Sequence, residues 1–261
     1  MKLFLALLLA GLELITGCGK GATSAVKPLL VGLDLSYPPF ETIGADGRPS
    51  GVSVDLANAL GESLHRPVRL ENIPFTGLIP SLLTGKIDLI LSSMTDTPER
   101  RQSIAFSDPY LTIGLAALAG KNSTLSSNGL DHPGRTIAVR QGTTAQAWAT
   151  DHLKQAKVLV LDKESSAVLE VIQGKADAFL YDQMSVWKNQ KEHPAETVAL
   201  LAPIQTEHWA IGLRPGDTAL RDGVNAFLKS FRASGGFDLL GDKHLKEQKE
   251  AFAAAGIPFY F

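Results

Sequence analysis

The sequence predicts an α/β protein of two similarly built lobes, and three observations lead to this prediction. Strand-like apolar runs alternate with helical patterns along the chain. The segment 83–91 (LTGKIDLIL) recurs 89 residues later as 172–180 (IQGKADAFL), and each copy joins a helix end to an apolar strand through Gly-Lys and an aspartate. Chain also remains after the second lobe, which indicates that it crosses between the lobes twice, near 112–116 and near 206–210. The alternative for the recurring segment is chance similarity of a common helix-to-strand turn.

The first lobe is expected to comprise residues 28–113 together with 208–261. Its first strand ends at Pro38 and Pro39, because two prolines cannot continue a ladder. Ser53 is the expected N-cap of the next helix, and Gly85 is expected to end a later one. The expected elements are strands at 29–35, 68–73, 87–91, 111–118 and 207–214 and helices at 54–64, 77–84, 218–232 and within the tail 237–254.

The second lobe is expected to comprise residues 114–207. A Gln-Gly-Thr-Thr turn at 141–144 precedes a helix, so the N-terminus of that helix lies at the turn. By the alignment of the recurring segment, Ser93 and Asp182 are equivalent positions just past strand ends, where open α/β sheets bind ligands. The expected elements are strands at 136–139, 158–161 and 176–180 and helices at 145–154 and 165–173.

The N-terminus predicts export. Lys2 precedes an apolar run at 3–12 that is too short to span a membrane, and small residues lie just before Cys18. This pattern resembles the lipobox of bacterial lipoproteins, so we expect a signal peptide at 1–17, a lipid on Cys18 and a flexible tether at 18–27 that holds the protein at the cell envelope. The alternatives are an uncleaved anchor or a plain secretory signal with a buried cysteine.

Composition limits the possible functions. With 261 residues, 44% of them apolar, the chain can bury a large core. Its net charge of −2 gives no reason to expect a nucleic-acid partner. The single cysteine excludes an internal disulfide, and the six histidines are scattered without metal-ligand spacing. We therefore expect no metal and no cofactor.

The most informative stretch is the strand–loop–helix corner at 87–101. Thr97 and Pro98 have the residue types of an N-cap and a first helical position. Arg100 and Arg101 then fall in the first turn, where the helix dipole disfavours a cation by about 0.3–1 kcal/mol. Together with free backbone N–H groups, Arg100 would seat a small anion such as a carboxylate. The alternative is an exposed helix start whose arginines pair with nearby acids.

Several motifs together resemble the bacterial periplasmic amino-acid-binding proteins, the polar amino acid class of extracellular solute-binding proteins. The resemblance implies a type II periplasmic-binding-protein-like fold, in which two lobes joined by two hinge strands close on a ligand for an ABC importer. Val52 and Ser53 depart from the family, which usually has an aromatic and an acid there. The matching segments are DLSYPPFE (34–41), GVSVDLA (51–57), the corner through IAFSDPY (104–110), QGTT (141–144) and DAFLYD (177–182).

The resemblance implies how an amino-acid carboxylate is held. Arg100 matches the arginine that forms a fork to the ligand α-carboxylate. Thr95 of the same lobe, and Thr143 and Thr144 of the other, match the groups that assist it. Two helix starts would then face one carboxylate.

The resemblance also implies how the ammonium is held. Ser93, which follows Ser92 at the corner, matches a backbone carbonyl that accepts from the α-ammonium, and Asp182 matches the carboxylate that pairs with it. A zwitterion taken out of water needs both poles paired, which agrees with this assignment. For Asp182 alone, the alternative is a helix cap for 183–189.

Four further residues match the ligand side-chain pocket. Tyr37 and Phe75 match its flanks, Asp34 the group that meets the polar end of the ligand, and Arg140 the pocket floor. Aromatic walls and an aspartate suit an amide or a cation, whereas Arg140 opposes a cation unless Asp34 neutralises it, so glutamine or a similar polar amino acid is favoured. The alternatives are core aromatics and a turn-forming aspartate.

The expected function is therefore non-enzymatic binding of a free amino acid by a monomer that serves an ABC transporter permease. One alternative is a dehydratase of the cyclohexadienyl type, which uses the same fold. Asp182 argues against it, because its charge would repel a second substrate carboxylate. The other alternative is an amino-acid sensor domain. We do not favour it, because the sequence shows no transmembrane segment or signalling module after the cleft residues.

Overall fold

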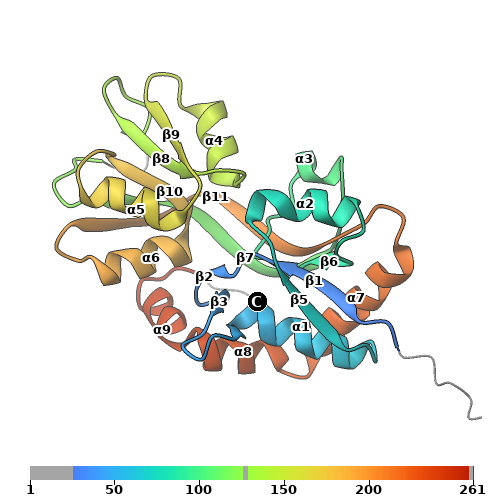
Figure 1. Cartoon of the computed structure of the whole chain (residues 1–261). Coiled ribbons are helices and arrows are strands. Elements are labelled where there is room, and N and C mark those ends of the chain that lie inside the picture. The colour runs from blue at the N-terminus through green and yellow to red at the C-terminus, as the bar shows by residue number, and fades with distance from the viewer. Residues whose placement is uncertain (1–25, 126–128, 259–260) are drawn as a thin grey trace, which may run out of the picture.

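A computed structural model describes residues 26–125, 129–258 and 261 (Figure 1). The expected signal peptide, Cys18 and most of the expected tether lie outside these residues. Among the described residues, no helix combines the length and apolarity needed to cross a bilayer.

The chain forms two α/β lobes on either side of two long strands, as predicted (Figure 1). One eight-stranded sheet runs through both lobes in the order β5-β1-β6-β11-β7-β10-β8-β9. Within each lobe the outer strands are parallel to one another. The long strand β7 is antiparallel to β10, and the long strand β11 is antiparallel to β6. The outer strands are β1 (Leu29–Leu33), β5 (Val68–Asn72), β6 (Leu89–Ile90), β8 (Thr136–Arg140), β9 (Lys157–Leu161) and β10 (Ala178–Asp182).

The two central strands are much longer than the apolar runs that predicted them. β7 spans Ala105–Gly120 and β11 spans Thr197–Leu213, and they pair with a register shift between Leu200 and Gln205. At about 3.3 Å per residue each reaches about 50 Å, enough to run through both lobes. The first half of β11 was not predicted although residues 198–202 are apolar, and in the structure this half is mostly only partly buried.

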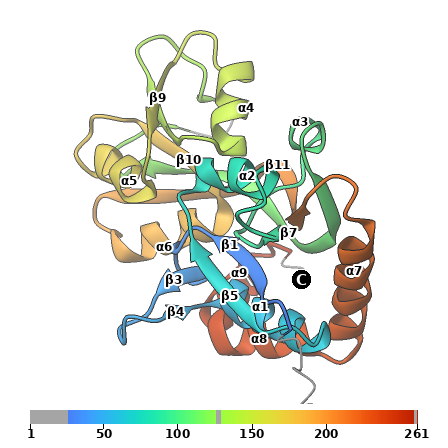
Figure 2. The same cartoon turned by 45° about the vertical axis from the view of Figure 1, so that its right-hand side comes forward.

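Helices cover both faces of the sheet in each lobe, so each lobe has two apolar cores. In the second lobe α4 covers one face, and α5 and α6 cover the other. In the first lobe α2 covers one face, and α1 packs with the C-terminal helices on the other (Figure 2). The helices are α1 (Val52–Ser63), α2 (Phe75–Leu83), α3 (Pro98–Arg101), α4 (Thr144–His152), α5 (Glu164–Ile172), α6 (Gln183–Glu192), α7 (Thr218–Ala233), α8 (Gly236–His244) and α9 (Lys246–Ala254).

The recurring segment is a real structural repeat. In the first lobe the Leu30 N–H donates to Asp88 Oδ2 (3.1 Å), and the Asp88 N–H donates back to the Leu30 carbonyl (2.7 Å). In the second lobe the Thr136 N–H donates to Asp177 Oδ2 (2.7 Å), and the Asp177 N–H donates back to the Thr136 carbonyl (2.8 Å). Each aspartate thus ties the start of its strand to the neighbouring strand, which argues against chance similarity.

The expected N-cap of α1 is wrong. Gly51 is the N-cap, and Ser53 lies inside the helix, where its hydroxyl donates to Glu41 Oε2 (2.6 Å) instead of accepting from the first N–H groups of the helix. Gly51 has φ 121°, and a Cβ there would lie 2.3 Å from the Phe40 carbonyl oxygen. Only glycine fits this approach, so the helix begins at a backbone contact with the small sheet of β2 (Ser36–Tyr37), β3 (Glu41–Ile43) and β4 (Pro49–Ser50).

We predict that Gly51→Ala lowers the free energy of unfolding by roughly 3 kcal/mol or more, because the new Cβ would displace backbone atoms. Gly47→Ala is the matched control, since Gly47 also has a positive φ (77°) but no atom within 4 Å of the added Cβ. The control should lose only the backbone cost of about 1–2 kcal/mol. Urea unfolding measures both, and equal losses would contradict the prediction.

Candidate functional site

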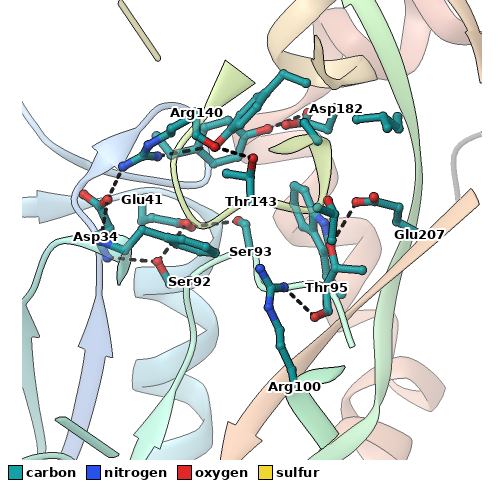
Figure 3. Close-up of a pocket in the computed structure, with 17 residues that line it drawn as sticks. Asp34, Glu41, Ser92, Ser93, Thr95, Arg100, Arg140, Thr143, Asp182 and Glu207 are labelled. Carbon is teal, nitrogen blue, oxygen red and sulfur yellow. Dashed lines mark hydrogen bonds and ion pairs between the residues drawn. The ribbon is translucent and has the colours of Figure 1, made fainter. Parts of the chain in front are cut away.

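All eleven predicted ligand-binding residues line one cavity between the lobes (Figure 3). Its empty volume is about 480 Å³, which includes space open to solvent. The predicted lining residues are Asp34, Tyr37, Phe75, Ser92, Ser93, Thr95, Arg100, Arg140, Thr143, Thr144 and Asp182. Six further lining residues were not predicted, namely Glu41, Leu115, Ala145, Tyr181, Glu207 and Trp209.

The carboxyl ends of parallel strands bring these residues together. Asp34 directly follows β1, Ser92 and Ser93 follow β6, Arg140 ends β8, and Asp182 ends β10. The sheet therefore turns its carboxyl ends toward the cavity from both lobes, as open α/β sheets do at their ligand sites. This explains how residues more than a hundred positions apart meet.

The corner helix α3 forms as predicted at its start but is only one turn long. The Thr97 side chain accepts from the Arg100 N–H (3.2 Å), and Pro98 is the first helical residue. Both arginines thus lie in the last turn as well as the first, which weakens the argument from the helix dipole. Arg101 pairs with Asp96, as the alternative interpretation proposed, whereas Arg100 forms no ion pair among the described residues.

Arg100 is a cation of the cavity held by neutral partners. Its guanidinium donates to the Thr95 carbonyl (2.7 Å) and, across the cleft, to the Gly142 carbonyl (3.1 Å). It lies over the ring of Phe75, 5.5 Å from the centroid. Burial lowers the pKa of Arg100, which the negative charge of Glu207 opposes. The charge of this guanidinium is therefore not compensated by a direct carboxylate partner.

The start of α4 faces the same region from the second lobe. Thr143 is its N-cap, accepting from the Gln146 N–H (3.3 Å) while its hydroxyl donates to the Arg140 carbonyl (2.7 Å). The hydroxyl of Thr143 is therefore already engaged. The first N–H groups of a helix have no partner within the helix, so Thr144 and Ala145 bring backbone donors to the cavity.

Asp182 combines the two roles that the sequence left open. Its Oδ1 caps α6 by accepting from the Met184 and Ser185 N–H groups (3.0 Å each). The same oxygen accepts from the Tyr37 hydroxyl of the other lobe (2.6 Å). Burial raises the pKa of Asp182 to about 7, although these hydrogen bonds oppose the shift. The carboxylate is thus a helix cap, an interlobe contact and part of the cavity wall at once.

Asp34 and Arg140 form a buried ion pair across the cleft. Asp34 also accepts from the Phe75 N–H (3.1 Å) and from the Ser36 hydroxyl (2.7 Å). Arg140 also donates to the Tyr181 hydroxyl (3.4 Å). Asp34 therefore neutralises Arg140, which was the condition for a cationic ligand to be tolerated.

Two buried acids escaped the sequence analysis. Glu207, on β11, accepts from the Thr95 hydroxyl (2.9 Å), which is therefore engaged, and from the Gln205 amide (2.9 Å). Glu41 is 1% exposed, and burial raises its pKa to about 8. Glu41 ends the DLSYPPFE motif and could have been noticed there. No sequence feature pointed to Glu207, because its position at the cavity depends on the course of the long strand β11 between the lobes.

The cavity therefore contains more carboxyl groups than cations (Figure 3). After Asp34 and Arg140 cancel, Arg100 is opposed by Asp182, Glu41 and Glu207. Such a cavity suits a ligand with one carboxylate and one or more positive or hydrogen-bond-donating groups. Tyr37, Phe75, Tyr181 and Trp209 supply aromatic walls.

Known proteins are similar to this chain over most of its length. It is 31% identical to "ABC transporter arginine-binding protein 1" of Escherichia coli (strain K12), over 93% of this chain and 98% of that protein. A putative binding component of an ABC transporter from Wolinella succinogenes, solved with lysine, has a TM-score of 0.78 at 31% identity and covers 83% of this chain and 95% of its own.

A third relative bears on the dehydratase alternative. It is an ancestral amino acid-binding protein described as a precursor of cyclohexadienyl dehydratase, with a TM-score of 0.75 at 33% identity, covering 83% of this chain and 94% of its own. Residues 29–247 match the family described as bacterial extracellular solute-binding proteins, family 3. The fold, the cavity and these similarities lead to one conclusion: this chain belongs to the family 3 bacterial extracellular solute-binding proteins.

Proposed function

We propose that this protein binds a free amino acid between its lobes, outside the cytoplasm, and delivers it to the permease of an ABC importer. The observation that carries the proposal is that one cavity is lined both by the guanidinium of Arg100, which has no ion pair among the described residues, and by the carboxylate of Asp182. A zwitterion supplies the missing partner of each group.

The carboxylate of the ligand would lie between Arg100 and the start of α4. A guanidinium and helix N–H groups together favour a carboxylate, through charge-assisted hydrogen bonds and through the positive end of the helix. The hydroxyls of Thr95 and Thr143 are engaged elsewhere, so these residues contribute through their backbone positions.

The ammonium of the ligand would lie at Asp182 and Ser93. The described hydrogen bonds of Asp182 all go to Oδ1, which leaves Oδ2 for the ligand. Ser93 has φ 48°, a left-handed conformation that is uncommon outside glycine and often found at functional sites. Its carbonyl is a second acceptor for the ammonium.

The ligand side chain is the less constrained part. The sequence favoured glutamine or a similar polar amino acid, and the buried carboxyls suit its amide. The same carboxyls suit a basic side chain, and relatives are named for arginine or solved with lysine. The second carboxylate of a dehydratase substrate would meet the carboxyl groups of Asp182 and Glu207, so we infer binding rather than catalysis. We also propose that the protein acts as a monomer.

A thermal-shift panel of the common amino acids tests the proposal. A ligand at 100 times its dissociation constant adds about 2.7 kcal/mol to the free energy of unfolding, which is readily detected. No stabilisation by any amino acid would contradict the proposed function.

Arg100→Ala should weaken binding of the amino acid found in the panel by roughly 30-fold or more. Loss of one partner from a desolvated charge pair costs about 2–5 kcal/mol, whereas the exposed one-turn helix should remain folded. Calorimetry measures the affinity, and circular dichroism checks the fold. Arg101→Ala is the matched control, because that side chain is exposed and pairs with Asp96. Equal affinities of the two variants would rule out the carboxylate assignment.

Asp182→Asn should weaken binding of the amino acid by about tenfold or more, but binding of its deaminated analogue by much less. Asparagine keeps the side-chain oxygen that caps α6 and loses only the negative charge. Titration calorimetry at pH 8, where Asp182 is largely ionised, compares the two ligands. Equal losses for both ligands would argue against an ammonium at this position.

We also propose that a lipid on Cys18 anchors the protein to the cell envelope; the support is the lipobox-like sequence before it, since Cys18 lies outside the described residues. Cys18→Ser should move the protein from the membrane fraction to the soluble extracytoplasmic fraction. Fractionation and immunoblotting measure this, and an unchanged membrane fraction would contradict the anchor.

A further inference from the structure

Glu41 is a buried acid with only neutral hydrogen-bond partners. It lies in β3 on the first-lobe wall of the cavity (Figure 3), and it accepts from three hydroxyls. These belong to Ser53 of α1 (2.6 Å) and to Ser93 (3.1 Å) and Ser92 (3.4 Å) after β6. Among the described residues Glu41 forms no ion pair, so nothing fixes its charge.

The three hydroxyls suit either protonation state. A hydroxyl is both donor and acceptor, so it can donate to a carboxylate or turn to accept from a protonated carboxyl. Ser92 Oγ also accepts from the Asp34 N–H (2.9 Å), which places it without fixing its own proton.

The groups around Glu41 favour the neutral state in the empty protein. Burial is the largest cause that raises the pKa of Glu41, and the negative charge of Asp34 raises it further. The hydrogen bonds from the three serine hydroxyls lower it. Tyr37 of β2 pairs beside it in the small sheet, and Tyr110 of β7 is a neutral phenol whose own pKa is raised. The cation Arg140, which also lines the cavity, already forms an ion pair with Asp34. With a pKa of about 8, Glu41 is mostly protonated at pH 7.

We propose that Glu41 receives the distal end of the ligand side chain and that a basic side chain displaces its proton, so that binding of a basic amino acid releases a proton and binding of an amide does not. An ammonium beside the carboxyl favours the ionised form. The carboxylic acid then becomes a carboxylate paired with the ammonium, and the proton leaves to the solvent. This inference rests on the proposed function.

An amide side chain leaves the proton in place. A protonated carboxyl donates to the amide oxygen and accepts from the amide N–H, so both groups are satisfied without a change of charge. The same cavity would therefore accept basic and amide side chains, and the proton count separates the two binding modes.

The test is titration calorimetry of L-lysine and L-glutamine at pH 7 in phosphate and in Tris, whose ionisation enthalpies differ. The dependence of the binding enthalpy on the buffer gives the number of protons released. Lysine should release nearly one proton more than glutamine. Asp182 meets the α-ammonium of both ligands, so its contribution cancels in this difference.

The pH dependence should follow with a defined sign. Below pH 8 lysine must displace a proton, so its affinity should rise up to tenfold per pH unit from pH 6 and level off above about pH 8. The affinity ratio of lysine to glutamine removes the effects common to both ligands.

Two variants locate the proton. Glu41→Gln should abolish the difference in proton release and weaken lysine binding at least tenfold more than glutamine binding. Ser53→Ala removes the shortest hydroxyl contact from a residue that does not line the cavity. It should move the levelling-off of lysine affinity to higher pH and leave glutamine affinity unchanged.

The outcomes separate this inference from the proposed function. Equal proton release for the two ligands, or a difference that persists in Glu41→Gln, would overturn the inference alone. So would binding of glutamine without any binding of lysine. If neither these nor any other amino acid binds, the proposed function fails, and this inference fails with it.

Discussion

The ion pair between Asp34 and Arg140 joins the two lobes and sets the charge of the cavity. It is buried, and the desolvation cost of two such charges is recovered only when the lobes bring them together with their hydrogen bonds complete. In this structure Asp34 accepts from Phe75 and Ser36, which belong to its own lobe. Arg140 donates to Tyr181, which lies with it in the second lobe. Because the charges of this pair cancel, Arg100, Asp182, Glu41 and Glu207 are the ionisable side chains left to set the charge that a ligand meets.

The closed arrangement depends on groups that are also structural. Asp182 and Thr143 each cap a helix of the second lobe while they face the cavity. Tyr37 and Arg100 then reach across from the first lobe to Asp182 and to the Gly142 carbonyl. A group fixed by a helix cap has little freedom to move, so the recognition geometry is built in when each lobe folds. In this structure the two half-sites meet through these interlobe contacts.

The serine-rich turn after β6 has a different physical character from these caps. Ser92 and Ser93 surround Glu41 with hydroxyls that can exchange donor and acceptor roles, and Ser53 completes the set from α1. Ser53 therefore contacts a buried acid of the cavity wall and does not cap its helix. One side of the cavity thus has groups fixed by helix caps, and the other has hydroxyls whose donor and acceptor roles can exchange.

The sequence by itself determined the two-lobed α/β fold, the repeat at Asp88 and Asp177, and eleven residues that line one cavity. These are local properties or motif properties, carried by alternating patterns and by turn residues. Only the tertiary structure decided the length of β7 and β11, the cap at Gly51, the presence of Glu41 and Glu207 in the cavity and the pairing of Asp34 with Arg140. Each of these depends on which surfaces lie against each other. Burial and distance set the charge of an acid and decide whether only glycine fits at a position. The order of residues alone does not specify burial or distance.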